Sequence, residues 1–235
     1  MCGRFLLTAP PEALQRLFGF LELPNLAPRY NVAPSQAVAA MLLDGAAERR
    51  FAWLRWGLLP AWSKEGTAPL INARSETVAE KPSFRDAFAR RRAVVFADGF
   101  YEWRQGGNRQ PYCIRLTDNA PFAFAAIWEP IAGAGEGGPG PFELRGGCAL
   151  MTTQANAKMA EVHHRMPVIL TPEQIGPWLD PATPRDDLQA LLKPLPEAAV
   201  TLTPVSKRVN AVREDDAGLL AEEELPAVPT QMKLL

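Results

Sequence analysis

Short apolar runs, interrupted by proline and glycine, are the feature that most constrains the fold of this chain. Its 235 residues include 23 prolines and 17 glycines, which are scattered between the apolar segments. Segments of this kind, when rich in Val, Ile, Phe and Leu, are typical of strands, because helices usually need longer periodic stretches. Strands are therefore predicted at 38–43, 51–56, 93–97, 112–116, 122–128, 148–152 and 168–170.

Helix signals are fewer. Thr8 is placed to cap a helix over 10–18, and Ser83, with Asp86 three residues later, resembles a capping box. Thr171, followed by Pro and Glu, predicts the start of a further helix. Because helices and strands do not alternate regularly, the sequence favours an α+β fold with largely antiparallel sheets and a few short flanking helices over a doubly wound parallel sheet.

No linker divides the chain into domains. The segment 105–108 predicts a hairpin turn, and the glycine-rich segment 132–141 predicts a loop. The alternative for 132–141 is a domain boundary, which its short, strand-like flanks disfavour. We therefore expect a single domain over residues 1–235.

The composition excludes several classes of protein. No run approaches the roughly 18 consecutive apolar residues of a membrane helix, and residues 1–7 contain no signal-peptide core, which predicts a cytoplasmic protein without membrane contact. The three cysteines, Cys2, Cys113 and Cys148, are odd in number and far apart, so neither a disulfide framework nor a zinc site is indicated. No cofactor is expected.

Cys2 is the residue with the most distinctive chemistry. Removal of the initiator Met would leave an N-terminal cysteine, whose α-amine has a pKa of about 7.7–8.0 and whose thiol has a pKa of about 8.5. About 10–20% of such an amine is neutral at pH 7 and can form a Schiff base with an aldehyde, after which the thiol closes a thiazolidine ring. The alternative is that Cys2 is only a small residue before a strand.

Glu102 and the two histidines are candidates for proton transfer. Glu102 lies between two large aromatic residues, so it is either desolvated, with a raised pKa that suits acid-base catalysis, or it alternates out to solvent. His163 and His164 are adjacent, and they are either a proton-transfer site or a surface pair without a role. The remaining Cys and acidic residues lack metal-ligand spacing, so no metal is expected.

Arginines beside aromatic and proline residues suggest contacts with nucleic acid. Asn72 and Arg74 lie on one side of the chain if their segment is extended, where they can hold a sugar and a phosphate. The segments 29–34 and 55–62 combine Arg with Tyr, Trp and Pro, a mixture suited to phosphate contact and base stacking. Each segment is also compatible with ordinary core and turn positions.

Six ordered motifs, taken together, point to one family. They are Met1-Cys2-Gly3-Arg4-Phe5, Arg29-Tyr30-Asn31-Val32-Ala33-Pro34, Trp56-Gly57-Leu58-Leu59-Pro60, Asn72-Ala73-Arg74, Asp98-Gly99-Phe100-Tyr101-Glu102-Trp103 and His163-His164-Arg165-Met166-Pro167. In this order they resemble the SRAP family, the SOS response-associated peptidases or abasic-site processing proteins. The resemblance runs from Met1 to about Asn210.

The resemblance implies a mechanism. The residue matching Cys2, freed by loss of Met1, would form a thiazolidine cross-link with the aldehyde of an abasic site and so protect the lesion in the DNA damage response. Glu102 would be the acid-base group, and His163 would assist opening of the sugar ring and reversal of the link. Asn72 would position the sugar. The family name also implies peptidase activity, and a lyase activity is a further expectation.

The resemblance implies a binding surface as well. A positively charged cleft would hold single-stranded DNA, with Arg4 and Arg29 on the backbone, Arg74 on the phosphates near the lesion, and Pro34 and Trp62 against bases. We expect a monomer that associates with the nucleoid during DNA damage.

Two positions depart from the family pattern. Many members carry a second aromatic residue directly after the one matching Trp62, whereas this chain has Ser63. One missing base-aromatic contact weakens single-strand binding by about 1–3 kcal/mol. The family often has Asp where this chain has His164, and loss of that carboxylate alters the pKa of His163.

Other interpretations stay open. Met1 is removed either by the protein itself or by a housekeeping aminopeptidase. A glutamine amidotransferase with an N-terminal Cys also begins Met-Cys-Gly, but it uses the thiol for acyl transfer, and the segments around Asn72 and Glu102 have no obvious counterpart in that class. A non-enzymatic single-strand-binding module would keep the Arg and Trp residues without needing Cys2.

The net charge of −1 conceals an uneven distribution. Residues 1–115 contain 16 Lys and Arg against 10 Asp and Glu, whereas residues 116–235 contain 9 against 16. Five of the six motifs lie in the basic half, where Arg dominates, as bidentate contact with phosphate favours. We therefore expect DNA binding to be local to one cleft.

Overall fold

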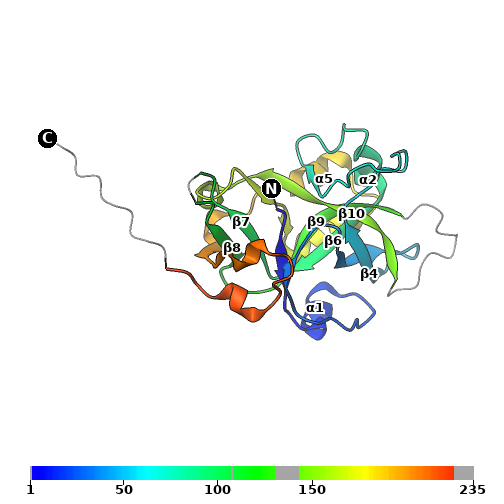
Figure 1. Cartoon of the computed structure of the whole chain (residues 1–235). Helices are drawn as coiled ribbons and strands as arrows, with labels where there is room; N and C mark the ends of the chain where they lie inside the picture. The colour runs from blue at the N-terminus through cyan, green and yellow to red at the C-terminus, as the bar shows by residue number, and fades with distance from the viewer. Residues whose placement is uncertain (1, 107, 131–142, 225–235) are drawn as a thin grey trace.

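The computed structural model describes residues 2–106, 108–130 and 143–224, which form two β-sheets with short helices (Figure 1). The strands are β1 (Phe5–Leu7), β2 (Arg29–Val32), β3 (Ala37–Leu43), β4 (Arg49–Trp56), β5 (Asn72–Arg74), β6 (Arg92–Ala97), β7 (Gly99–Trp103), β8 (Pro111–Leu116), β9 (Phe122–Pro130), β10 (Leu144–Gln154), β11 (Arg165–Pro167), β12 (Ile169–Leu170) and β13 (Val200–Pro204). The α-helices are α1 (Pro11–Phe18), α2 (Arg85–Arg90), α3 (Ala157–Ala160), α4 (Pro172–Leu179) and α5 (Arg185–Leu191), and the 3-10 helices are η1 (Glu197–Ala199), η2 (Lys207–Asn210) and η3 (Ala217–Leu220).

The two sheets differ in connectivity. The five-stranded sheet has the order β13-β8-β7-β1-β2, and all its pairings are antiparallel. The larger sheet follows β11-β10-β4-β3-β6-β9-β12, with β5 also on β10. Since β10 pairs with β9 as well as with β4, the strands β4, β3, β6, β9 and β10 close into a ring. Among the described strands, both parallel pairings involve β10, one with β4 and one with β5.

These pairings confirm the predicted fold class, an α+β fold with largely antiparallel sheets and a few short helices. The blue N-terminal strand runs between β7 and β8 on one side and β4, β6, β9 and β10 on the other (Figure 1). Within the described ranges, no helix combines the length and the apolar character that crossing a lipid bilayer requires.

Buried apolar side chains fill three layers. One cluster packs Leu14 and Phe18 of α1, Phe88 of α2 and Trp178 of α4 onto one face of the larger sheet. A second cluster takes residues from both sheets and lies between them; within it the Phe5 ring is 5.1 Å from Trp56, centroid to centroid. Full burial of one such aromatic side chain stabilises the fold by about 1.5–3 kcal/mol.

The third layer covers the outer face of the five-stranded sheet. Leu6 and Tyr101 there contact Val205, Val209 and Leu219, which belong to residues 205–220. We call residues 205–220 the C-terminal clamp, because this segment packs across β1 and β7 from the outside. The N-terminal strand is therefore enclosed between the inter-sheet core and the clamp.

Gly99 allows β1 to pack closely on β7. Leu6 lies opposite Gly99 in the antiparallel register, and a Cβ atom at Gly99 would lie only 2.7 Å from Leu6 Cδ2 and 3.2 Å from the Ile114 carbonyl oxygen. A larger residue would therefore require the buried Leu6 side chain of β1 to shift and would crowd the β8 backbone at Ile114. This close approach fixes the position of the residues that precede β1 relative to the end of β7.

The strand predictions agree with the structure, whereas two helix-cap predictions are wrong. The Thr8 hydroxyl donates to Asp98 Oδ2 at 2.6 Å instead of capping α1, whose N-cap is Pro10. Ser83 is not a cap either, because α2 begins at Arg85 and its N-cap residue makes no side-chain bond. The Thr171 prediction is confirmed by a capping box at the start of α4. The turn predicted at 105–108 lies between β7 and β8, although Gly107 is outside the described residues. The predicted loop 132–141 also lies outside the described residues.

Candidate functional site

The N-terminal segment places Cys2 in the apolar layer between the two sheets. Its side chain is fully buried within the second cluster, beside residues of both sheets. Burial, and to a smaller extent the negative charge of Glu102, raises the pKa of the Cys2 thiol far above its usual value. The thiol therefore carries its proton at neutral pH.

Asn72 holds the backbone of Cys2. It is the first residue of β5, where it lies opposite Leu150 of β10, and its Nδ2 donates to the Cys2 carbonyl oxygen at 2.8 Å. The Asn72 Oδ1 atom is buried and has no hydrogen-bond partner among the described residues. A buried polar atom of this kind costs about 1–3 kcal/mol, and a hydroxyl or N–H of a bound ligand would satisfy it.

Glu102 is buried, with 3% of its surface exposed, so it does not alternate out to solvent. Burial raises the pKa of its carboxyl above the usual range. Its neighbour Tyr101 packs in the third cluster and donates its hydroxyl to the Tyr30 carbonyl oxygen at 2.8 Å. Because side chains alternate along a strand, Glu102 faces the inter-sheet side, where its charge acts on Cys2.

The two histidines border the end of β7. The backbone N–H of Gln105 donates to the Val162 carbonyl oxygen at 3.2 Å, and Gln105 Nε2 lies 3.1 Å from His164 Nδ1. The rings of His163 and His164 stack, with centroids 4.4 Å apart. Burial lowers the pKa of the half-buried His163, and the positive charges of His164 and Arg165 act in the same direction. The His163 imidazole is therefore neutral at pH 7.

The predicted DNA-binding residues differ in exposure. Arg74 is exposed at the end of β5, Trp62 is 66% exposed in the turn after β4, and Pro34 and Ser63 are partly exposed. Arg4 is partly buried, with its Nη1 donating to Asn31 Oδ1 at 2.8 Å and to the Val209 carbonyl oxygen at 2.7 Å.

Arg29 is placed differently from Arg4. It lies opposite Leu7, toward the end of β1 away from Cys2, and its Nε donates to Asp215 Oδ2 at 2.6 Å. Its Nη2 also donates to Gln36 Oε1 at 2.8 Å. The structure therefore brings Cys2, Asn72 and Glu102 together with the histidine segment beside them, and it places Arg29 at the clamp.

The sequence analysis did not identify Asn31 and Asp215 as important. Asn31 is fully buried, and its Nδ2 donates to the carbonyl oxygens of Val209, Ala211 and Glu214 in the C-terminal clamp. Asp215 accepts from the backbone N–H of Asn31 at 2.9 Å. Asn31 belongs to a family motif, but its partners lie about 180 residues further along the chain, so no local pattern indicates them.

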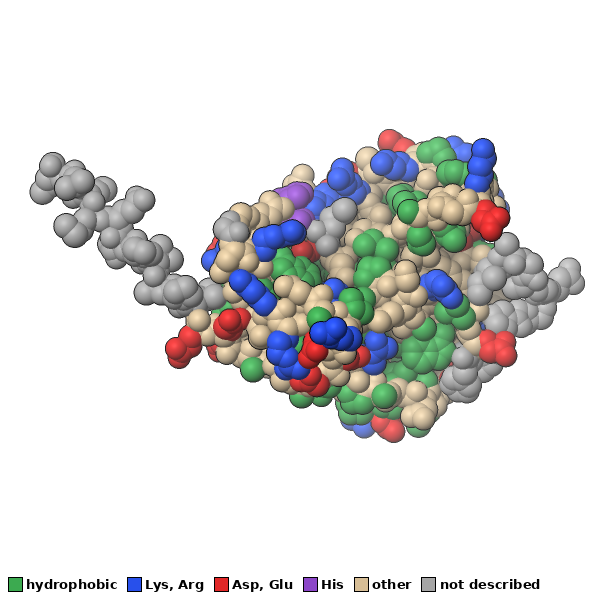
Figure 2. All heavy atoms as spheres, in the orientation of Figure 1, with side chains coloured by type: hydrophobic (Ala, Val, Ile, Leu, Met, Phe, Trp, Pro, Cys, Tyr) green, Lys and Arg blue, Asp and Glu red, His purple; other side chains and the backbone are tan. Residues whose placement is uncertain are grey.

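Charge on the face that carries the histidines is unevenly arranged. Figure 2 shows blue basic side chains around a central area of apolar and uncharged atoms, with the purple histidines at its edge. Within the described part of the chain, no group of three or more His, Cys, Asp or Glu is arranged to hold a metal ion. The site therefore offers a protonated thiol, a carboxyl with a raised pKa, a neutral imidazole and an amide. The predicted DNA cleft stays a prediction.

Comparison with known proteins gives consistent matches. Residues 1–212 match the family described as SOS response associated peptidase (SRAP). The abasic site processing protein YoqW of Bacillus subtilis is 38% identical over 228 residues, covering 94% of this chain and 99% of the relative. YedK of Escherichia coli, also named an abasic site processing protein, is 31% identical over 94% of this chain and 99% of its own length. HMCES of Gallus gallus, with the same description, is 32% identical over 88% of this chain and 69% of its own length.

Solved structures have the same fold. A protein from Bacteroides thetaiotaomicron superposes with a TM-score of 0.79 at 24% identity, covering 95% of this chain and all of the other. A phage-related protein from Bordetella bronchiseptica superposes with a TM-score of 0.71 at 31% identity, covering 88% of this chain and 95% of the other.

Proposed function

The chain belongs to the SRAP family, and from that membership we propose that it processes abasic sites in DNA through a covalent bond to Cys2. The substrate is single-stranded DNA in which the lost base leaves a sugar that opens to an aldehyde at C1′. The observation that carries the proposal is the placement of Cys2, whose carbonyl is held by Asn72 and whose thiol lies under the influence of Glu102. An N-terminal aminothiol beside an acid-base group is the arrangement that aldehyde capture requires.

The proposed cross-link forms in successive steps once Met1 has been removed. Hydrolysis of the Met1–Cys2 peptide bond frees the α-amine of Cys2, and the nitrogen of this amine adds to the aldehyde carbon to give a carbinolamine. Protonation of the carbinolamine hydroxyl and its loss as water give a protonated imine, whose nitrogen keeps its hydrogen. The Cys2 sulfur then adds to the imine carbon, the thiol proton passes to the base that had protonated the hydroxyl, and a neutral thiazolidine ring results. One molecule of water leaves for each cross-link, and no oxidant or reductant is needed.

Glu102 suits the proton transfers in this sequence. Because burial raises its pKa, the carboxyl holds a proton at a higher pH than it would in water, and it can give that proton to the departing hydroxyl. The resulting carboxylate can then take the proton of the thiol, which burial keeps protonated until the imine has formed. The same group therefore acts first as an acid and then as a base.

The remaining residues hold the DNA. Asn72 Oδ1, which lacks a partner among the described residues, accepts a hydrogen bond from a hydroxyl group of the opened sugar. Arg74 and Arg4 contact phosphates, and the exposed Trp62 stacks on a base. His163, neutral at pH 7, takes part in opening the sugar ring and in reversal of the link. Arg29 and Pro34 are proposed as outer contacts of the same strand, and the protein acts as a monomer on DNA in the cytoplasm.

Denaturing electrophoresis tests the proposal. Protein that has lost Met1 is mixed with single-stranded DNA containing one abasic site, and the wild type is expected to give a shifted band that survives denaturation. Cys2→Ala gives none, and Cys2→Ser gives only a product that must be trapped by reduction, because oxygen does not form the stable sulfur-containing ring. Cys113→Ala, a change to another buried cysteine, serves as the matched control and cross-links normally. A stable band from Cys2→Ala would refute the mechanism.

A second variant tests the acid-base role. Glu102→Gln, prepared like the wild-type sample with Cys2 as its first residue, lacks the transferable proton but keeps the shape of the side chain, so the cross-linking rate is expected to fall by about 10²–10⁴-fold with DNA affinity unchanged. An unchanged rate removes Glu102 from the reaction. A wild-type protein that binds the DNA without cross-linking to it would instead indicate a simple single-strand-binding module.

Removal of Met1 is a separate step, and we propose that the protein catalyses it with Glu102 as the acid-base group, in line with the peptidase in the family name. Intact mass spectrometry distinguishes this from removal by an aminopeptidase. Glu102→Gln keeps the small residue at position 2 that an aminopeptidase accepts, so retention of Met1 in this variant alone supports self-processing. Loss of Met1 from wild type and variant alike assigns the step to an aminopeptidase.

A further inference from the structure

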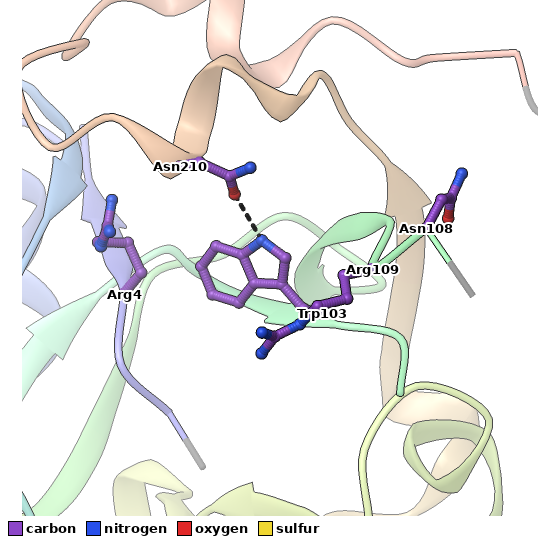
Figure 3. Close-up of a pocket in the computed structure, with 5 residues that line it drawn as sticks. All are labelled: Arg4, Trp103, Asn108, Arg109 and Asn210. Carbon is purple, nitrogen blue, oxygen red and sulfur yellow. Dashed lines mark hydrogen bonds between the residues drawn. The ribbon is translucent and has the colours of Figure 1, made fainter. Parts of the chain in front are cut away.

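A pocket of about 530 Å³ lies beside the proposed site, on the other side of β7. Its lining residues are Arg4, Trp103, Asn108, Arg109 and Asn210 (Figure 3). Consecutive strand residues point to opposite faces, so Glu102 faces the inter-sheet side and Trp103 faces this pocket. Arg4 is two residues from Cys2 and Trp103 directly follows Glu102, so the pocket borders the reacting groups without containing them.

The indole of Trp103 is held in a fixed orientation. Its Nε1 donates to Asn210 Oδ1 at 2.7 Å, as the dashed line in Figure 3 shows, and Asn210 belongs to η2 of the C-terminal clamp. The ring is only partly buried, and the Arg4 guanidinium carbon lies 6.0 Å from the ring centroid. An aromatic ring that is oriented in advance and half-exposed is suited to packing against a planar ligand.

The pocket also has positive charge that no acidic residue neutralises. Among the described residues, neither Arg4 nor Arg109 has a carboxylate within ion-pair distance, and Arg4 uses only its Nη1 atom for the bonds to Asn31 and Val209. Arg109 is exposed, and its side chain makes no hydrogen bond within the described part of the chain. Its backbone has φ of 50°, a conformation that residues other than glycine seldom adopt, and this conformation is compatible with a functional constraint.

We propose that this pocket binds one nucleotide of the strand that flanks the lesion, with the base against Trp103 and the phosphate between Arg4 and Arg109. The pocket volume falls within the range of about 300–1,000 Å³ found for small-molecule sites, which is more than a phosphate ion alone requires. Planar guanidinium groups contact phosphate oxygens with two bonds, and aromatic rings accept any base. The inference rests on the proposed function, because the strand that occupies the pocket is the one whose lesion reacts with Cys2.

Binding of lesion-free single-stranded DNA, measured over a range of salt concentrations, tests the pocket separately from the chemistry. Arg109→Ala is expected to weaken binding several-fold and to lower the slope of log K against log salt by about 0.7, the value for one phosphate contact on a single strand. Trp103→Leu is expected to weaken binding with the slope unchanged, because it removes stacking but no charge. On an oligonucleotide whose flanking sugars are tetrahydrofuran units, which carry neither a base nor an aldehyde, Trp103→Leu should bind as the wild type does.

Arg16→Ala is the matched control. Arg16 is an exposed arginine of α1 without an ion pair or side-chain hydrogen bond in the described part of the chain, and its removal should change neither the affinity nor the slope. An Arg109→Ala variant that binds like Arg16→Ala overturns the nucleotide site. If in that case the wild type still cross-links abasic DNA, the proposed function stands alone. If the wild type fails to cross-link abasic DNA but Arg109→Ala still weakens single-strand binding and lowers the salt slope, the covalent mechanism is refuted and the nucleotide site is supported.

Discussion

The arginines near Cys2 and those at the C-terminal clamp carry the same charge in opposite surroundings. At the clamp, Arg29 pairs with Asp215 at 2.6 Å, and Arg208 pairs with Glu214 at 2.7 Å and with Asp216 at 2.6 Å. Near the site, Arg4 and Arg74 have no carboxylate within ion-pair distance among the described residues. Partly exposed ion pairs contribute only about 0–1 kcal/mol to stability, so their larger effect is to cancel charge that would otherwise attract DNA. The location of acidic partners, more than the number of arginines, therefore decides where a phosphate can bind.

Asn31 joins the two regions, and its loss is expected to have the largest effect on stability. The residue accepts from Arg4 and donates to three carbonyl oxygens of the clamp. Asn31→Ala leaves these buried groups without partners, which should lower the free energy of unfolding by about 2–4 kcal/mol. Denaturant titration measures the change. Asn25→Ala, at an exposed asparagine, is the control and should stay within about 0.5 kcal/mol of wild type. A loss below about 1 kcal/mol for Asn31→Ala would show that the clamp does not depend on this residue.

Arg74 and Arg208 test the comparison directly on DNA. Arg74→Ala removes a guanidinium that has no acidic partner, so single-strand affinity should fall about tenfold, equivalent to about 1.4 kcal/mol. Arg208→Ala removes one whose charge Glu214 and Asp216 already cancel, and affinity should change less than about twofold. Fluorescence anisotropy with a labelled oligonucleotide at fixed salt gives both values. Equal effects of the two substitutions would show that ion pairing does not determine which arginines bind DNA.

Local patterns in the sequence were sufficient for some elements. The apolar runs predicted β3, β4, β6, β9, β10 and β12 of the larger sheet and β8 of the five-stranded sheet, because burial requires apolar side chains wherever the strands lie. The Thr171 box depends only on residues within one helical turn. The Thr8 prediction failed because Asp98, 90 residues away, takes its hydroxyl. Local pattern alone cannot weigh such a competing partner.

The site was predictable in its residue types and not in its contacts. The motif order indicated Cys2, Asn72 and Glu102 together, and the structure places Asn72 on the Cys2 carbonyl. The excess of basic residues in the first half of the chain predicted DNA binding local to one cleft, but one of the counted residues, Arg29, is paired with Asp215 from the acidic half. Ion pairs between distant segments are invisible to charge counting, which explains why the count overstated the positive charge available to DNA.

His164→Asp would place a carboxylate beside the His163 ring, just as carboxylates lie beside Arg29 and Arg208 at the C-terminal clamp. The His164 ring stacks on His163, and its positive charge contributes to lowering the pKa of His163. His164→Asp replaces that like charge with an opposite one, so the pKa of His163 should rise and a larger fraction of the imidazole should be protonated at pH 7. Because the chain has only two histidines, the variant has a single imidazole, and an NMR titration reports it without ambiguity.

His164→Asn separates the two causes of that rise. It removes the charge of His164 without supplying a carboxylate, so its His163 should titrate between the wild type and His164→Asp. Equal pKa values in the two variants would mean that a carboxylate at position 164 does not act on His163. If His163 takes part in reversal of the cross-link, the pH midpoint of the reversal rate should move upward by the same amount as the NMR value. A reversal profile that stays in place while the pKa moves would remove His163 from that step and leave Glu102 as its proton-transfer group.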